Sequence, residues 1–324
     1  MEQLLLAPMD GLSDHVLREV LTRIGGYDRA TCEFVRISGS LLPHRTFRRI
    51  CPELDSGGLT RSGTPVAVQM LGSDPASMAE NAQLLCELSP AGIDLNFGCP
   101  AKTVNRHGGG AMLLATPEIL FKIASAVRKV VPGRIPFTAK MRLGVADTAK
   151  ALECAHALEA GGVEALVVHA RTKLDGYRPP AHWEWVGHIR SAVKIPVAAN
   201  GEVWTVDDYL RCRAVGGISA VMLGRGAVAD PFLARRIRAR IGGAPLSCDR
   251  HEDWRELLPL IAEYWRLAQG KVVPKHVSGR LKSWLAWLRR TFVEADELYA
   301  AVRTVNDPSE ASRVLASRGV PVAG

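Results

Sequence analysis

The strongest constraint on the fold is a short apolar, strand-like segment that recurs eight times along residues 1 to 226. Helical patterns, such as 117–131 and 205–214, stand between most of these segments. The eight segments are Leu4–Ala7, Cys32–Val35, Val66–Leu71, Ile93–Asn96, Phe137–Met141, Leu166–His169, Pro196–Asn200 and Ala220–Leu223. Strand and helix repeated eight times predict an α/β fold, the (β/α)8 TIM barrel, because a doubly wound sheet rarely needs so many units.

The chain of 324 residues leaves room for a second domain after the barrel. Residues 242–245 resemble a linker, and helical patterns follow at 251–268 and 281–305. We therefore predict a TIM barrel over residues 1–242 and a C-terminal all-helical domain over 250–324. Trp284 and Trp287 lie in a helical pattern with apolar spacing, and we expect both to pack in a core rather than hold a cofactor.

Composition narrows the class of protein. With 47% apolar and 23% charged residues, the chain has the composition of a folded globular protein. No apolar run approaches 18 residues and no signal peptide opens the chain, so we expect no membrane association. The seven cysteines show no Cys-x-x-Cys pair, which favours a reduced, cytoplasmic protein, and we expect a monomer. The net charge of +8 favours an anionic partner.

Polar or glycine-rich residues follow seven of the eight predicted strands. Because the carboxyl ends of all barrel strands meet on one face, these residues are expected to share one site. The most informative are Asp10, Gln69, Asn96, Lys140, Arg142, His169, Arg171, Asn200, Glu202 and Arg225. They include no His-x-His motif or carboxylate cluster, so we predict no metal and set aside a metal-dependent hydrolase.

The loop after the fourth strand carries Cys99, between a strand ending in Asn96 and Phe97 and the three glycines at 108–110. A free cysteine is most often a small buried hydrophobe. Here, however, the costly glycine-rich backbone indicates that something approaches the loop closely. A thiol with an ordinary pKa is mostly protonated at neutral pH, so Cys99 suits a general acid better than a nucleophile.

Two further features point to anions. Gly224, Arg225 and Gly226 follow the eighth strand, where barrels commonly bind a phosphate. Residues 266–290 hold seven basic residues and no acidic one. Such a run is either a solvated face or an anion-binding surface, and its lack of acidic residues leaves both readings open.

The motif Asp94–Pro100, followed by Val104 and by Gly110-Ala111, resembles the signature of the tRNA-dihydrouridine synthases. The segments 6–11 and 199–202 match as well, and the resemblance spans nearly the whole chain. Within the family, the chain is most similar to the C-type bacterial enzymes, through the segments 33–36, 49–53, 168–173 and 280–285. The resemblance implies NADPH- or NADH-dependent reduction of a tRNA D-loop uridine, uridine 16, to 5,6-dihydrouridine with FMN as cofactor.

The resemblance also implies roles for individual residues. Cys99 would give the proton to C5 of the uracil. The residues implied to bind FMN are Pro8, Met9, Asp10, Gln69, Lys140, His169, Asn200, Gly201, Glu202, Gly224 and Arg225. Those implied to bind the uracil or the tRNA are Arg36, Asn96, Tyr177, Arg280, Lys282 and Arg303.

Two other functions are compatible with parts of the sequence. A flavin-dependent dehydrogenase of free pyrimidines, of the dihydroorotate or dihydropyrimidine type, would share the flavin face but would not need the basic helical tail. A non-catalytic RNA-binding protein would not need Cys99, Lys140 and the phosphate loop together.

Overall fold

The computed structural model describes residues 2–101, 108–245, 249–271 and 273–322. The motif residue Val104 and Cys248 lie outside the described residues. The chain divides into two compact units. The first comprises Met1–Asp10, Tyr27–Val203 and Asp207–Gly224, and the second comprises Gly11–Gly26, Trp204–Val206 and Arg225–Gly324. The domain limits 1–242 and 250–324 stay a prediction.

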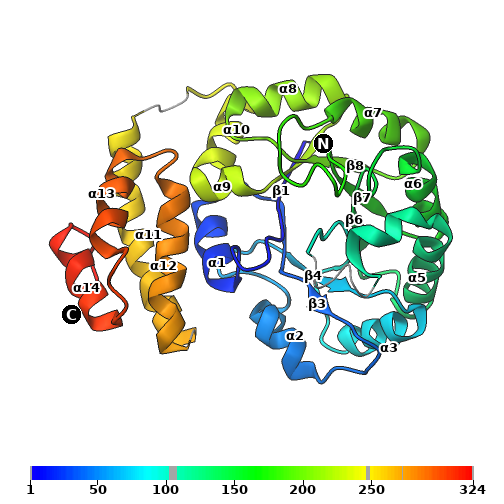
Figure 1. Ribbon diagram of the computed structural model, residues 1–324, viewed down its shortest axis with the longest axis horizontal. Helices are drawn as coiled ribbons and strands as arrows, with labels where there is room; N and C mark the ends of the chain where they lie inside the picture. The colour runs from blue at the N-terminus through cyan, green and yellow to red at the C-terminus, as the bar shows by residue number, and fades with distance from the viewer. Residues whose placement is uncertain (1, 102–107, 246–248, 272, 323–324) are drawn as a thin grey trace. The chain divides into compact units, whose positions relative to one another are not determined.

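The first unit is built on a closed parallel barrel (Figure 1). Its strands are β1 Gln3–Leu6, β2 Arg29–Thr31, β3 Val35–Arg36, β4 Val66–Leu71, β5 Ile93–Phe97, β6 Phe137–Arg142, β7 Ala165–His169, β8 Val197–Asn200 and β9 Ala220–Leu223. Each strand pairs in parallel with the next around the ring, β9 pairs with β1, and β2 pairs with β4, while β3 lies only against β4. Eight strand positions therefore close the barrel, which confirms the predicted TIM-barrel fold.

The second barrel strand differs from its predicted range of 32–35. It consists of β2 and β3, and both pieces pair with β4 through Thr31 opposite Ala67 and Val35 opposite Met70. From Thr31 to Val35 this strand advances four residues, while β4 advances only three, from Ala67 to Met70. One extra residue therefore interrupts the ladder. A bulge of this kind bends a strand, and apolar character alone cannot reveal it.

Helices follow the strands along the chain. They are α1 His15–Ile24, α2 His44–Ile50, α3 Pro75–Cys86, α5 Pro117–Val130, α6 Ala151–Ala160, α7 Trp183–Ala192, α8 Val206–Gly216, α9 Arg225–Ala229 and α10 Leu233–Ile241, with short 3-10 turns at Pro52–Ser56 and Gly110–Ala115. Helix α5 buries one apolar face, while α1 is buried at seven consecutive positions, 16–22. Local signals set several starts: the Asp14 carboxylate accepts from the first amides of α1, and Asp74 caps α3 ahead of Pro75.

Besides α1, α9 and α10, the described part of the second unit contains the helices α11 Arg250–Lys271, α12 Pro274–Leu288, α13 Val293–Val302 and α14 Pro308–Ser317 (Figure 1, yellow to red). The continuous helix predicted over 281–305 is wrong, because residues 289–292 turn the chain between α12 and α13. Phe292 is buried at this turn, so its packing outweighs the local helical pattern. Trp284 is buried, with its ring centroid 4.8 Å from that of Tyr264, which confirms its predicted core role.

Candidate active site

The barrel brings the carboxyl ends of its strands to one mouth, and the predicted residues of the first unit follow from those ends. Gln69, Asn96 and Lys140 lie on the neighbouring strands β4, β5 and β6, and Asn96 is the register partner of Lys140. Next to Lys140 in register is Val167, which belongs to an apolar cluster with Ala7, Ala198 and Met222. One part of the mouth therefore has polar side chains and the other has apolar ones.

A chain of hydrogen bonds runs through the polar part. The Asn96 Nδ2 donates to Gln69 Oε1 at 2.7 Å. The Asn96 Oδ1 accepts from the backbone N–H groups of Gly98 and Cys99, both at 2.9 Å. The side chain that the sequence analysis assigns to the uracil thus also shapes the turn that carries Cys99.

Cys99 lies just after β5, and apolar side chains cover part of its surface. Its thiol packs with Leu71, Phe34 and Ala101, and only 9% of the residue is exposed. Burial raises the pKa of the Cys99 thiol, and the charge of Asp10 acts in the same direction, against the Ala101 backbone and two arginines that lower it. Because the thiol stays protonated at neutral pH, this setting favours the general-acid role.

Arg142, at the end of β6, secures the backbone around Cys99. Its Nε donates to the carbonyl of Gly98 at 2.8 Å, and its Nη1 donates to the carbonyls of Thr172 and Gly176 at 2.9 and 2.8 Å. Its guanidinium also lies 5.3 Å from the ring centroid of Tyr177. A single buried arginine thus ties the Cys99 loop to the loop that carries the predicted uracil contact.

Lys140 is a second buried basic residue of the mouth, besides Arg142. Burial and the charge of Arg142 lower the pKa of Lys140 to about 7, while the Asp94 carboxylate acts to raise it. An ammonium in such a place gains stability when an anionic or electron-rich group is brought beside it. Its surroundings therefore suit a residue that faces a cofactor ring.

A second cluster forms at the ends of β7 and β8. Arg171 pairs with Glu202, and its Nε donates to the Arg178 carbonyl at 2.7 Å. Gly201 has a φ of +111°, and a Cβ there would come within 2.9 Å of the His169 ring. The backbone thus approaches His169 as closely as only glycine permits. Asn200 is held by its Nδ2, which donates to the Met222 carbonyl at 2.9 Å.

The first unit also has room beside the Cys99 loop. A pocket of about 530 Å³ is lined by Arg36, Leu71, Gly72 and other residues at the carboxyl ends of β3 and β4. Leu71 is the side chain that packs on Cys99, so Arg36 lies on the wall of a pocket next to the predicted acid. The structure therefore brings Arg36 and Cys99 to one region.

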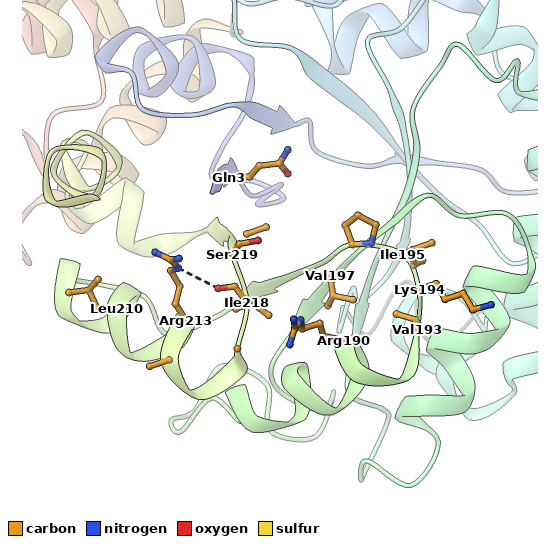
Figure 2. Close-up of a pocket in the computed structure, with 14 residues that line it drawn as sticks. Gln3, Arg190, Val193, Lys194, Ile195, Val197, Leu210, Arg213, Ile218 and Ser219 are labelled. Atoms are coloured by element: carbon orange, nitrogen blue, oxygen red, sulfur yellow. Dashed lines mark hydrogen bonds between the residues drawn. The ribbon is translucent and has the colours of Figure 1, made fainter. Parts of the chain in front are cut away.

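A separate pocket of about 930 Å³ lies at the amino-terminal ends of β1, β8 and β9 (Figure 2). Gln3 and Ser219 line it, together with Arg213, whose Nε donates to the carbonyl of Ile218 at 3.3 Å. These strand ends lie opposite the carboxyl ends that carry the predicted catalytic residues. The pocket is therefore not part of the site at the mouth.

Pro8, Met9, Asp10 and Gly224 belong to the first unit, whereas Arg225, Arg280, Lys282 and Arg303 belong to the second. Arg225 starts α9, and its guanidinium lies 5.4 and 5.9 Å from the ring centroids of Trp204 and Trp287. Arg280 donates to the Gly11 carbonyl at 3.1 Å, and the Lys282 ammonium donates to Asn306 Oδ1 at 2.9 Å. Both predicted tRNA contacts therefore already have partners within their own unit.

The basic run at 266–290 is less uniform than its sequence indicates. Arg266 pairs with Glu263 at 2.8 Å and Arg289 with Asp296 at 2.5 Å, so carboxylates just outside the run balance both of its ends. Arg303 is exposed at the end of α13. The central cations, Arg280 and Lys282, carry the anion-binding prediction.

The sequence pattern indicates no role for Asp94, and it marks Arg142 and Arg171 only as polar strand ends. Asp94 is buried in β5 and accepts from Gln69 Nε2 and from Thr138 Oγ1, both at 2.6 Å. The alternation of β5 places Asp94 on the same face as Asn96, and this was the available signal.

Known proteins match almost the whole chain. The family model described as "Dihydrouridine synthase (Dus)" matches residues 5–316. The chain is 56% identical over 310 residues to the tRNA-dihydrouridine(16) synthase of Ralstonia nicotianae, covering 96% of this chain and 94% of the relative. It is also 56% identical over 321 residues to the protein of the same name from Cupriavidus necator, covering 99% and 98%.

Among solved structures, a 2-naphthoyl-CoA reductase complex matches with a TM-score of 0.56 at 13% identity. That match covers 75% of this chain and 50% of the reductase chain, and at this identity it supports the fold alone. The family match and the two full-length relatives carry the assignment. The chain belongs to the dihydrouridine synthase family.

Proposed function

We propose that this protein reduces uridine 16 of the tRNA D-loop to 5,6-dihydrouridine. The observation that carries the proposal is the Cys99 thiol, which burial keeps protonated. Asn96 holds the turn that carries this thiol, and Asn96 is the register partner of the buried Lys140. Two relatives at 56% identity over nearly the full chain are tRNA-dihydrouridine(16) synthases. The proton donor Cys99 and the basic residue Lys140 then act in one reaction at the mouth of the barrel.

The residues of the mouth suit FMN as the cofactor. Gln69, Lys140 and His169 supply donors beside the apolar side chains of Ala7 and Met222, which is the combination that a flat, polar-edged ring needs. Gly201 allows close approach of the backbone near His169. Arg225 is proposed to bind the cofactor phosphate, since guanidinium groups pair strongly with phosphate. FMN, when bound, supplies the hydride that reduces C6 of the uracil.

The protein supplies the other half of the chemistry. Cys99 donates its proton to C5 of the uracil on the side facing its loop. Asn96 has a second N–H on Nδ2 besides the one given to Gln69, and we propose that it donates to a uracil carbonyl. That contact stabilises the negative charge that the carbonyl gains as C6 is reduced. Arg142 donates to the Gly98 carbonyl and so helps to position the turn that carries the thiol.

The proposed setting of the reaction is a cytoplasmic monomer that takes electrons from NADPH and uses no metal. Among the residues that the structure describes, no three His, Cys, Asp or Glu side chains gather as a metal site. In the described part of the chain, no helix combines the length and apolar character that crossing a membrane requires. Arg36, Tyr177, Arg280, Lys282 and Arg303 are proposed to bind the tRNA.

The test uses the purified protein, NADPH and three substrates: a tRNA transcript, the same transcript with cytidine at position 16, and free uracil. We expect a yellow protein that releases FMN on denaturation and forms dihydrouridine in the first transcript only, as read by mass spectrometry of the digested RNA. Reduction of free uracil at a similar rate would instead support the free-pyrimidine dehydrogenase. A protein that cannot be loaded with FMN would contradict the cofactor.

A further inference from the structure

The buried carboxylate of Asp94 stands at one end of a continuous chain of side chains that leads to Cys99. Asp94 Oδ2 accepts from Gln69 Nε2 at 2.6 Å, Gln69 Oε1 accepts from Asn96 Nδ2 at 2.7 Å, and Asn96 Oδ1 accepts from Cys99 N at 2.9 Å. Three strand positions, separated by up to 27 residues along the chain, thus join through short bonds. This chain of hydrogen bonds lies wholly within the first compact unit.

The two ends of this chain permit only one direction for the amides between them. A carboxylate oxygen facing Gln69 can only accept, and the backbone N–H groups of Gly98 and Cys99 can only donate. Gln69 must therefore turn its amine to Asp94 and its carbonyl to Asn96. Asn96 must then turn its amine to Gln69 and its carbonyl to the Cys99 turn. Reversing either amide sets N–H against N–H and oxygen against oxygen, in a region where Gln69 is fully buried.

This direction does not depend on whether Asp94 is ionised. Burial raises the pKa of the Asp94 carboxyl, while the bonds from Gln69 and Thr138 and the nearby charges of Lys140 and Arg29 act to lower it. If the carboxyl were protonated on Oδ1, the Thr138 hydroxyl would accept a hydrogen bond from it, since a hydroxyl both donates and accepts. Oδ2 would still accept from Gln69.

We propose that Asp94 is a positioning residue for uridine reduction: through Gln69 and Asn96 it orients the turn that presents the Cys99 thiol. This inference rests on the proposed function. It assigns Asp94 no contact with substrate or cofactor. It predicts that Asp94 and Asn96 act as one unit, because Asp94 reaches the backbone amides of Gly98 and Cys99 only through Gln69 and Asn96.

The test is a double-variant cycle on holoenzyme, with the two half-reactions measured separately by stopped-flow absorbance. We expect Asp94→Leu and Asn96→Ala each to slow reoxidation of the flavin by tRNA by about tenfold or more, since a misplaced acid weakens proton transfer. The double variant should be no slower than the slower single variant, because residues in one network do not act additively. Flavin reduction by NADPH, which needs no acid, should change by less than about threefold in Asp94→Leu.

Two matched variants distinguish the effect of the hydrogen bond between Gln69 and Asp94 from other effects of the carboxylate. Asp94→Asn should restore most of the rate, because its carbonyl can accept from Gln69 while its amine donates to Thr138. Thr138→Val removes the other donor to Asp94 and should stay close to the wild-type rate. The alkylation rate of Cys99 by iodoacetamide should change in Asp94→Leu and be restored in Asp94→Asn.

Two outcomes would overturn the inference. Multiplying losses in the double variant would mean that Asp94 and Asn96 act independently. A loss in Asp94→Asn equal to that in Asp94→Leu would mean that the charge of Asp94 matters, through Lys140, and not the chain. If Asp94→Leu fails to fold or to keep FMN, the smaller Asp94→Ala, which also removes the acceptor of the Gln69 amide, replaces it in the cycle. A wild-type enzyme that does not reduce tRNA would instead refute the proposed function.

Discussion

At the residue scale, the site depends on a few side chains whose surroundings differ from water. Cys99 is kept neutral by burial, Lys140 is buried beside Arg142, and Gly201 holds a backbone angle that other residues rarely adopt. Each of these settings predicts a measurable consequence of a single substitution.

Cys99→Ala should keep FMN and still oxidise NADPH, while dihydrouridine formation falls by about a hundredfold or more, because only the uridine half-reaction needs an acid. Dihydrouridine in digested tRNA measures the loss. Cys154→Ala is the matched control, since that thiol is buried in α6, with a sulphur contact to the Leu114 carbonyl. Near-normal dihydrouridine in Cys99→Ala would rule out this thiol as the acid.

Gly201→Ala should destabilise the protein by about 1–3 kcal/mol, because a side chain is strained at that φ and its Cβ would meet the His169 ring. FMN affinity should fall as His169 shifts. Urea unfolding and fluorescence titration with FMN are the measurements. Gly133→Ala is the control, because a Cβ there meets nothing within 4 Å. Equal effects of the two substitutions would show that the close approach is unimportant.

At the element scale, local periodicity identified most helices, whereas packing decided where the tail helices end. Phe292 is buried between α12 and α13, which divides one predicted helix into two. On α12 one face is core, with Trp284 and Leu285, while Arg280 and Lys282 are only partly buried. The same helix therefore supports the second unit and presents cations.

Arg280→Ala combined with Lys282→Ala should weaken tRNA binding, while FMN content stays normal. Each lost phosphate contact should lower the slope of log affinity against log salt by about one. Binding titrations at several salt concentrations measure this slope. Asn306→Ala is the control, because it removes the partner of Lys282 but leaves the cation. An unchanged affinity and slope in the double variant would exclude α12 as a tRNA contact and favour a free-pyrimidine substrate.

At the scale of the whole molecule, the barrel buries a lysine that an unfolded chain would expose. The pKa of Lys140 is lowered to about 7 in the folded protein, against an ordinary value of 10.5. Between these values the unfolded chain binds more protons than the folded protein. The contribution of this group to the free energy of unfolding therefore rises as the pH is raised through that window.

FMN-free protein should accordingly gain stability from pH 7 to 9 relative to Lys140→Met, by at most about 1.4 kcal/mol per pH unit. Urea unfolding at several pH values measures the difference between the two proteins. Lys129→Met, at an exposed position on α5, serves as the control and should show no such trend. A constant difference between wild type and Lys140→Met would contradict the lowered pKa.

The sequence by itself determined what depends on neighbouring residues. The eight strand segments, the turn at Cys99, the glycines and most helix positions follow from periodicity and backbone preference, which act over a few residues. Only the tertiary structure decided the bulge between β2 and β3 and the contacts of Asp94 and Arg142. Asn96 meets Gln69 across 27 residues and Arg142 meets Gly98 across 44, and such partners come together only when the barrel closes. The direction of each hydrogen bond in the site is therefore a property of the closed barrel, because it depends on which donor and acceptor the fold brings opposite each other.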